Sequence, residues 1–126
     1  MSALCLALAG AAVSLASVPA ERFTLSWTHS VERTEWREDW RIAGGGLVLD
    51  TARVKGGGAG VEPPPDARVE DGWIVWHPAV PPQERLVLAA SAHTADHRLC
   101  AAGACRALRD WAGGAGEGPV ELRPCP

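Results

Sequence analysis

The sequence predicts an all-β fold, a single antiparallel β-sandwich or flattened barrel of about seven to nine short strands. Three observations lead to this prediction. Short runs in which apolar and polar residues alternate recur along the chain, as expected for strands with one buried face. Clusters of glycine and proline separate these runs. A helical turn is plausible only at residues 106–111, and 126 residues suffice for one domain.

The N-terminal segment, residues 1–20, permits two interpretations. Residues 4–18 are apolar or small and residues 18–20 resemble a signal-peptidase site, which would make the segment a signal or an anchor. No lysine or arginine precedes this run, however, and it is shorter than the roughly 20 residues that span a bilayer. In either interpretation, residues 21–126 form the all-β domain.

In the second interpretation, residues 5–15 are the opening strand of the domain. Gly10 then lies at a turn, and Val13 and Leu15 face inward. Periodicity alone does not separate a short apolar strand from other buried segments, so the pattern leaves both interpretations open.

A hairpin is predicted between Phe23 and Ile42. Odd positions up to residue 31 are apolar except His29, and the even positions of the second strand are apolar except Glu38. Antiparallel pairing around the loop 32–35 places these two polar residues opposite each other.

The same register sets Trp27 opposite Trp40 and Val31 opposite Trp36. An inward glutamate without a partner is costly to bury. We therefore expect His29 and Glu38 to be in contact in the core.

The remaining elements follow from turn residues and short apolar runs. The glycines at 44–46 end the hairpin, and the stretch 56–66 is too rich in glycine and proline for regular structure. The expected elements are strands at 47–49 (extended by 52–55), 68–70 and 73–76 joined by Asp71-Gly72, a strand at 85–90, a cysteine hairpin at 97–108, and a closing strand at 119–124 with Val120 and Leu122 on one face.

Four cysteines in a short chain fit an oxidised compartment if the chain is exported. Cys100 and Cys105 flank a four-residue hairpin loop, so a cross-strand disulfide between them is the first choice. Cys5 and Cys125 then remain as a second bridge between the terminal strands. The alternative is four reduced thiols in a cytosolic protein. Zinc is disfavoured because no second close pair of ligands accompanies the cysteine hairpin.

The charge pattern argues against a nucleic-acid partner. The net charge is −3, and neither a basic cluster nor an acidic tail is present. His93 and His97 have a spacing that suits zinc only on a helix, which the surrounding loop sequence does not favour. No metal or other cofactor is expected.

Three segments resemble a known family. They are WTHSVERTEWREDWR at 27–41, GGGAGVEPPP at 56–65 and the cysteine hairpin with the terminal cysteine. Together they resemble the domain-of-unknown-function family 1850, with Val61 where the family usually has methionine. The residues that match its pattern are His29, Ser30, Glu32, Trp36, Glu38, Gly58, Ala59 and Gly60. All of them except Ser30 form the predicted ligand-binding or structural centre, and the glycine-proline loop at 56–66 is the expected contact surface.

The resemblance implies a non-enzymatic accessory or binding protein for a tripartite solute transporter of the TRAP/TAXI type. Its partner would be the membrane transporter or its solute-binding protein. The protein would be located in the periplasm or elsewhere outside the cytoplasm, with membrane association as one option. A cytoplasmic location is the alternative. The residues themselves do not identify a small-molecule ligand.

The alternative function is a small hydrolase or metal-dependent enzyme that uses His29 and Glu38, since a carboxylate that orients an imidazole is half of a hydrolytic triad. Ser30 points away from His29 on the same strand, which argues against it as the nucleophile. Arg37 and Arg41, with Trp73 or Trp76, form a third candidate, a docking surface for a protein.

Overall fold

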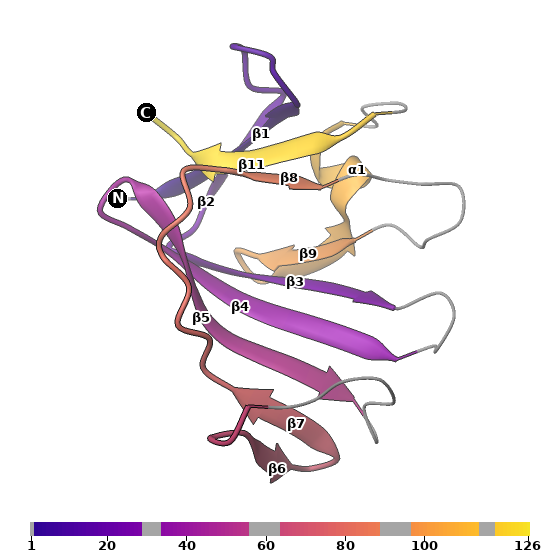
Figure 1. The fold of residues 1–126 in the computed structure, drawn as a ribbon. Helices are drawn as coiled ribbons and strands as arrows, with labels where there is room; N and C mark the ends of the chain where they lie inside the picture. Colours follow the sequence, from indigo (N-terminus) through magenta and orange to yellow (C-terminus); the bar gives the residue numbers. More distant parts are fainter. Residues whose placement is uncertain (1, 29–33, 56–63, 89–96, 114–117) are drawn as a thin grey trace.

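The computed structural model describes residues 2–28, 34–55, 64–88, 97–113 and 118–126. They form two antiparallel sheets that face each other and are not closed into a barrel (Figure 1). The strand order is β2-β1-β11-β8 in the four-stranded sheet and β10-β9-β3-β4-β5-β7-β6 in the seven-stranded sheet. The predicted all-β sandwich is therefore confirmed. The described residues hold eleven strands, because residues 3–8 and 16–19 form two strands in addition to the nine from residue 22 onward.

The smaller sheet joins the two ends of the described chain. Its strands are β1 (Ala3–Leu8), β2 (Ala16–Pro19), β8 (Leu86–Leu88) and β11 (Val120–Pro124). β1 lies between β2 and β11, so the opening segment of the chain is an inner strand of the domain.

The opening strand is shorter than the sequence pattern predicts. Gly10 does lie at a turn, with a φ of 82°. Val13 and Leu15, however, are 77% and 48% exposed, so the prediction that they face inward is wrong. The ladder between β1 and β2 extends only from Ala3 to Leu6, and Val13 and Leu15 belong to the connection beyond it.

The larger sheet contains the predicted hairpins. Its elements are β3 (Arg22–Thr28), β4 (Glu35–Ala43), β5 (Gly46–Lys55), β6 (Arg68–Glu70), β7 (Trp73–Trp76), β9 (Arg98–Ala101) and β10 (Ala104–Ala107), and the short helix α1 (Leu108–Trp111) follows β10. Asp71 and Gly72 have φ values of 50° and 83°, which is typical of the two-residue hairpin turn expected there. The cysteine hairpin also turns on two residues, Ala102 and Gly103, and not on four.

The register between β3 and β4 differs from the predicted one by four residues. Trp27 pairs with Trp36 and Leu25 pairs with Glu38, whereas the sequence pattern predicts His29 opposite Glu38. An even shift keeps every side chain on its face. The observed register is favoured because it sets aromatic rings directly opposite each other, Trp27 on Trp36 and Phe23 on Trp40.

The core lies between the two sheets. It is built from aliphatic side chains of the small sheet and from the inner face of β3, β4, β5 and β9, with α1 closing one side. The largest fully buried side chains of the described residues are Leu4, Leu6, Leu25, Leu47, Leu99, Leu122, Val54 and Val120. Val120 and Leu122 share one face of β11, as predicted.

Glu121 was not predicted to be buried, yet it is only 3% exposed. Its Oε2 lies 2.9 Å from Nη1 of Arg123, and its Oε1 lies 3.9 Å from Nε of Arg85. Arg123 also donates to the carbonyls of Ala11 and Ala12. This ion pair therefore ties β11 to the connection between β1 and β2.

Candidate functional site

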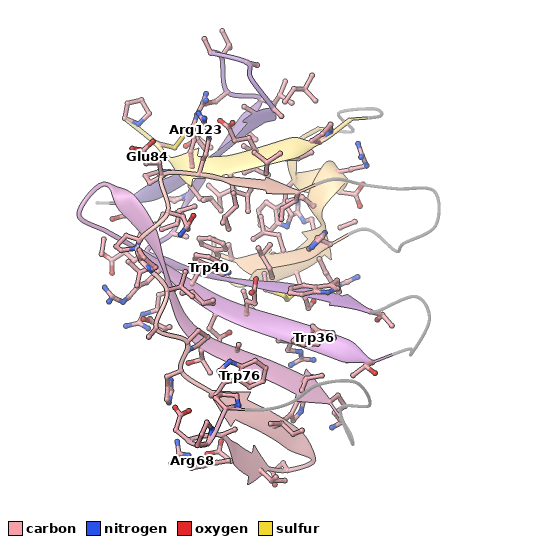
Figure 2. The ribbon with its side chains drawn as sticks, in the orientation of Figure 1. Trp36, Trp40, Arg68, Trp76, Glu84 and Arg123 are labelled. Atoms are coloured by element: carbon pink, nitrogen blue, oxygen red, sulfur yellow. A yellow bond between two sulfur atoms is a disulfide. The ribbon has the colours of Figure 1, made fainter. Side chains whose placement is uncertain are left out.

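Three tryptophans gather on the inner face of the larger sheet, on β3, β4 and β7 beside the core. Trp27 and Trp36 are stacked with their ring centroids 6.1 Å apart. Trp76 meets Trp36 edge-on, with the ring centroids 6.3 Å apart (Figure 2). His97, at the start of β9, lies 5.2 Å from Trp27. We call Trp27, Trp36 and Trp76 the tryptophan cluster; all three are only partly buried.

Glu38 lies beside the tryptophan cluster on the same face. Its neighbours across the strands are Leu25 and Ala52, both almost fully buried, and Ala52 in turn pairs with Trp76. The indole Nε1 of Trp40 donates a hydrogen bond to Oε1 of Glu38 at 3.3 Å. Burial raises the pKa of Glu38, and the weaker opposing influence of the Trp40 hydrogen bond does not cancel this effect.

Five of the residues predicted for the site lie outside the described residues. They are His29, Glu32, Gly58, Ala59 and Gly60, so the predicted contact between His29 and Glu38 stays a prediction. The described ends of β3 and β5, which come directly before two of these segments, nevertheless lie close to the same strand, β4. β3 ends at Thr28 opposite Glu35, and Trp36 pairs with Val54, one residue before β5 ends. The ends of β3 and β5 therefore lie beside the tryptophan cluster.

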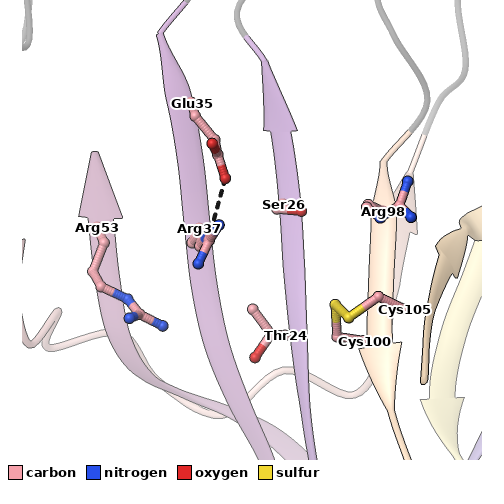
Figure 3. A pocket seen from close by; sticks show the side chains of 8 residues that line it. All are labelled: Thr24, Ser26, Glu35, Arg37, Arg53, Arg98, Cys100 and Cys105. Atoms are coloured by element: carbon pink, nitrogen blue, oxygen red, sulfur yellow. Dashed lines mark hydrogen bonds and ion pairs between the residues drawn. A yellow bond between two sulfur atoms is a disulfide. The ribbon is translucent and has the colours of Figure 1, made fainter. Parts of the chain in front are cut away.

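The outer face of the same sheet is polar and carries a pocket that the sequence analysis missed. The pocket has a volume of about 310 Å³. Its lining is Thr24, Ser26, Glu35, Arg37, Arg53, Arg98, Cys100 and Cys105 (Figure 3). The alternation of polar residues along β3 and β4 could have indicated this face, but not which residues of β5 and β9 join it.

The proposed docking residues divide between the two faces. The guanidinium of Arg37 and the ammonium of Lys55 lie 4.7 and 4.9 Å from the ring centroid of Trp73 on the outer face. Arg41 makes a 2.9 Å ion pair with Asp50. Trp76 faces inward. The sequence could not decide between the two tryptophans of β7, because they alternate across the strand.

The cysteines form the two pairs expected from the sequence. Cys5 is bonded to Cys125 and Cys100 to Cys105, with Cα atoms 5.0 and 4.0 Å apart. Such pairs are typical of proteins in oxidising compartments. In the part of the chain that the structure describes, no three potential metal ligands gather at one point. No helix of that part has the length and apolar character needed to cross a bilayer.

Comparison with known proteins gives one match. A family model described as "Domain of unknown function (DUF1850)" matches residues 23–108, which is more than half of the chain. The matched range contains the tryptophan cluster, Glu38 and the cysteine hairpin, while β1, β2 and β11 lie outside it. Comparisons with curated proteins and with solved structures gave no match.

Proposed function

Because the chain belongs to the domain-of-unknown-function family DUF1850, we propose that it is a non-enzymatic accessory of a tripartite solute transporter of the TRAP type. It acts outside the cytoplasm and binds the membrane transporter or its solute-binding protein. The two cysteine pairs support the compartment, since disulfides persist where the environment is oxidising.

The observation that carries the binding role is the partly buried tryptophan cluster. Aromatic side chains that stay partly exposed beside a core are enriched where proteins bind partners, because they bury a large apolar area with few rotatable bonds. Trp36 also matches the family pattern, and the described ends of β3 and β5 lie beside it. The cluster is thus the proposed contact surface.

The surroundings of Glu38 favour a structural role for this residue over a catalytic one. Its carboxyl group accepts the Trp40 hydrogen bond and lies between the buried side chains of Leu25 and Ala52. The raised pKa of Glu38 favours the alternative, a hydrolase, because a carboxyl group with a raised pKa suits a general acid.

A binding measurement tests the accessory role. The transporter's membrane subunits, reconstituted in nanodiscs, and its solute-binding protein are immobilised separately, and the oxidised chain is passed over each. We expect saturable binding to one of them. Trp76→Ala should weaken it at least about tenfold, since a central aromatic contact is typically worth more than about 1.4 kcal/mol.

Trp73→Ala is the matched control, because Trp73 lies on the same strand but on the outer face. It should leave binding unchanged. Absence of binding to both components would contradict the accessory role, and equal weakening by the two variants would exclude the tryptophan cluster as the contact.

An esterase assay tests the alternative function. The accessory proposal predicts that the chain does not hydrolyse short nitrophenyl esters above the buffer rate. Hydrolysis that Glu38→Gln abolishes, while the variant keeps its melting temperature, would replace the accessory proposal with the enzyme.

A further inference from the structure

A row of basic side chains crosses the outer face of the larger sheet. Ser26 on β3 pairs with Arg98 on β9 at one side and with Arg37 on β4 at the other, and Arg37 pairs with Arg53 on β5. Residues that pair across strands point to the same face. Three arginines and one small hydroxyl side chain therefore lie side by side.

The carboxylates near this row do not occupy all of its cationic groups. Glu35 Oε2 accepts from Nε of Arg37 at 2.8 Å. Both oxygens of Asp39 accept from the same nitrogen of Arg53, Nη2, at 3.0 and 2.7 Å. Nε of Arg53 is buried and has no hydrogen-bond partner in the described part of the chain.

Arg98 is the least compensated member of the row. It is exposed and forms no ion pair with any carboxylate of the described residues, whereas Arg37 and Arg53 each have one. Arg37 and Arg53 are directly paired, and like charges at such positions destabilise a sheet. The row thus carries an excess of positive charge that a bound anion would offset.

The shape of the pocket suits such an anion. Adjacent strands lie about 4.8 Å apart, so Arg98 and Arg37 stand about 10 Å apart with only Ser26 between them. Figure 3 shows Ser26 between Arg37 and Arg98, with the Cys100–Cys105 disulfide on the Arg98 side and Arg53 on the far side of Arg37. Its volume of about 310 Å³ is at the lower end of the range for small-molecule sites.

We propose that this pocket binds the oxyanion group of a small organic molecule, a carboxylate or a phosphate, between Arg98 and Arg37. The guanidinium groups donate to the anion from both sides, and the hydroxyl of Ser26 donates from the floor. Arg37 is held in place for this by Glu35 and by the ring of Trp73. The site is on the opposite face from the tryptophan cluster and does not depend on the proposed function.

Nuclear magnetic resonance of the oxidised, isotope-labelled full chain tests the proposal. Succinate, citrate and inorganic phosphate are titrated at constant ionic strength, with sodium chloride as the reference. We expect saturable shifts of the Nε–H signals of Arg37 and Arg98 and of the Ser26 amide. Saturation by the carboxylates alone, by phosphate alone or by both supports the site and identifies its ligand class.

The variants Arg98→Gln and Arg85→Gln provide the decisive comparison. Both arginines are exposed, but Arg85 lies beside β8 in the other sheet. Arg98→Gln should weaken binding at least about tenfold, and Arg85→Gln should leave it unchanged. Shifts that never saturate and equal those caused by chloride would overturn the proposal, as would equal weakening by the two variants.

Discussion

Trp40 donates its indole N–H to the carboxyl group of Glu38, two residues earlier on the same strand and the same face of the sheet. This hydrogen bond lets a carboxyl group occupy a position whose cross-strand neighbours are buried and apolar. It gives Glu38 a partner within its own strand, independent of any residue outside the described part of the chain. Burial favours the neutral carboxyl group more strongly than the Trp40 hydrogen bond favours the charged one, so the pKa of Glu38 is raised.

The raised pKa of Glu38 predicts that stability depends on pH. The folded chain holds the proton more tightly than the unfolded chain, in which the pKa has its ordinary value of 4.5. The free energy of unfolding should therefore fall as the pH rises from about 4.5 through the raised pKa, and level off above it. Urea titrations of the wild type and of Glu38→Gln between about pH 4 and pH 8 measure this. Parallel curves for the two proteins would contradict it.

The stacked pair of Trp27 and Trp36 predicts an energetic coupling. A double-mutant cycle with both residues changed to alanine should give about 1 kcal/mol of coupling in urea unfolding, the usual value for facing aromatic rings. A cycle between Trp27 and Trp40 is the control, because these residues are not paired in the observed register. Stronger coupling in the control would favour the register first inferred from the sequence.

The ion pair of Arg123 with Glu121 predicts a large cost for its loss. Arg123→Ala would leave a carboxylate that is 3% exposed without its 2.9 Å partner, and breaking such a buried pair costs about 3 kcal/mol or more. Arg85→Ala, whose contact with Glu121 is 3.9 Å long and exposed at the arginine, should cost less than about 1 kcal/mol. Chemical unfolding of both variants measures the difference, and equal costs would contradict the assignment.

The two disulfides should contribute unequally to stability. The Cys5–Cys125 bond closes a loop across 120 residues, and the Cys100–Cys105 bond closes one across 5. On chain-entropy grounds their removal by paired serine substitutions should cost about 5 and about 2 kcal/mol, respectively. Thermal melts of the two double variants test the order, and a larger loss for the hairpin bond would reverse it.

Local patterns in the sequence were sufficient for much of the fold. The alternation from Phe23 to Trp27, the Asp71-Gly72 turn and the spacing of Cys100 and Cys105 each determine structure within a few residues. The register of β3 on β4 was missed because several even shifts preserve the buried faces, and only the contacts between the aromatic rings distinguish them.

The candidate sites were harder to predict, because they depend on which strands become neighbours. Trp36 and Glu38 were identified from their position on the apolar face of one strand. The row of Arg98, Ser26, Arg37 and Arg53 joins four strands, and β9 is far from the others in sequence. Burial of Glu121 likewise depends on β11 being packed between β1 and β8, which no local pattern reveals.

The intact mass of the protein from its native host, measured after alkylation with and without prior reduction, tests the central claim of an exported domain closed by its own disulfides. We expect a mature chain that retains Cys5, takes up no alkyl group before reduction and takes up four after it. Alkylation of all four cysteines without reduction, or a mature chain that begins after Cys5, would contradict the claim.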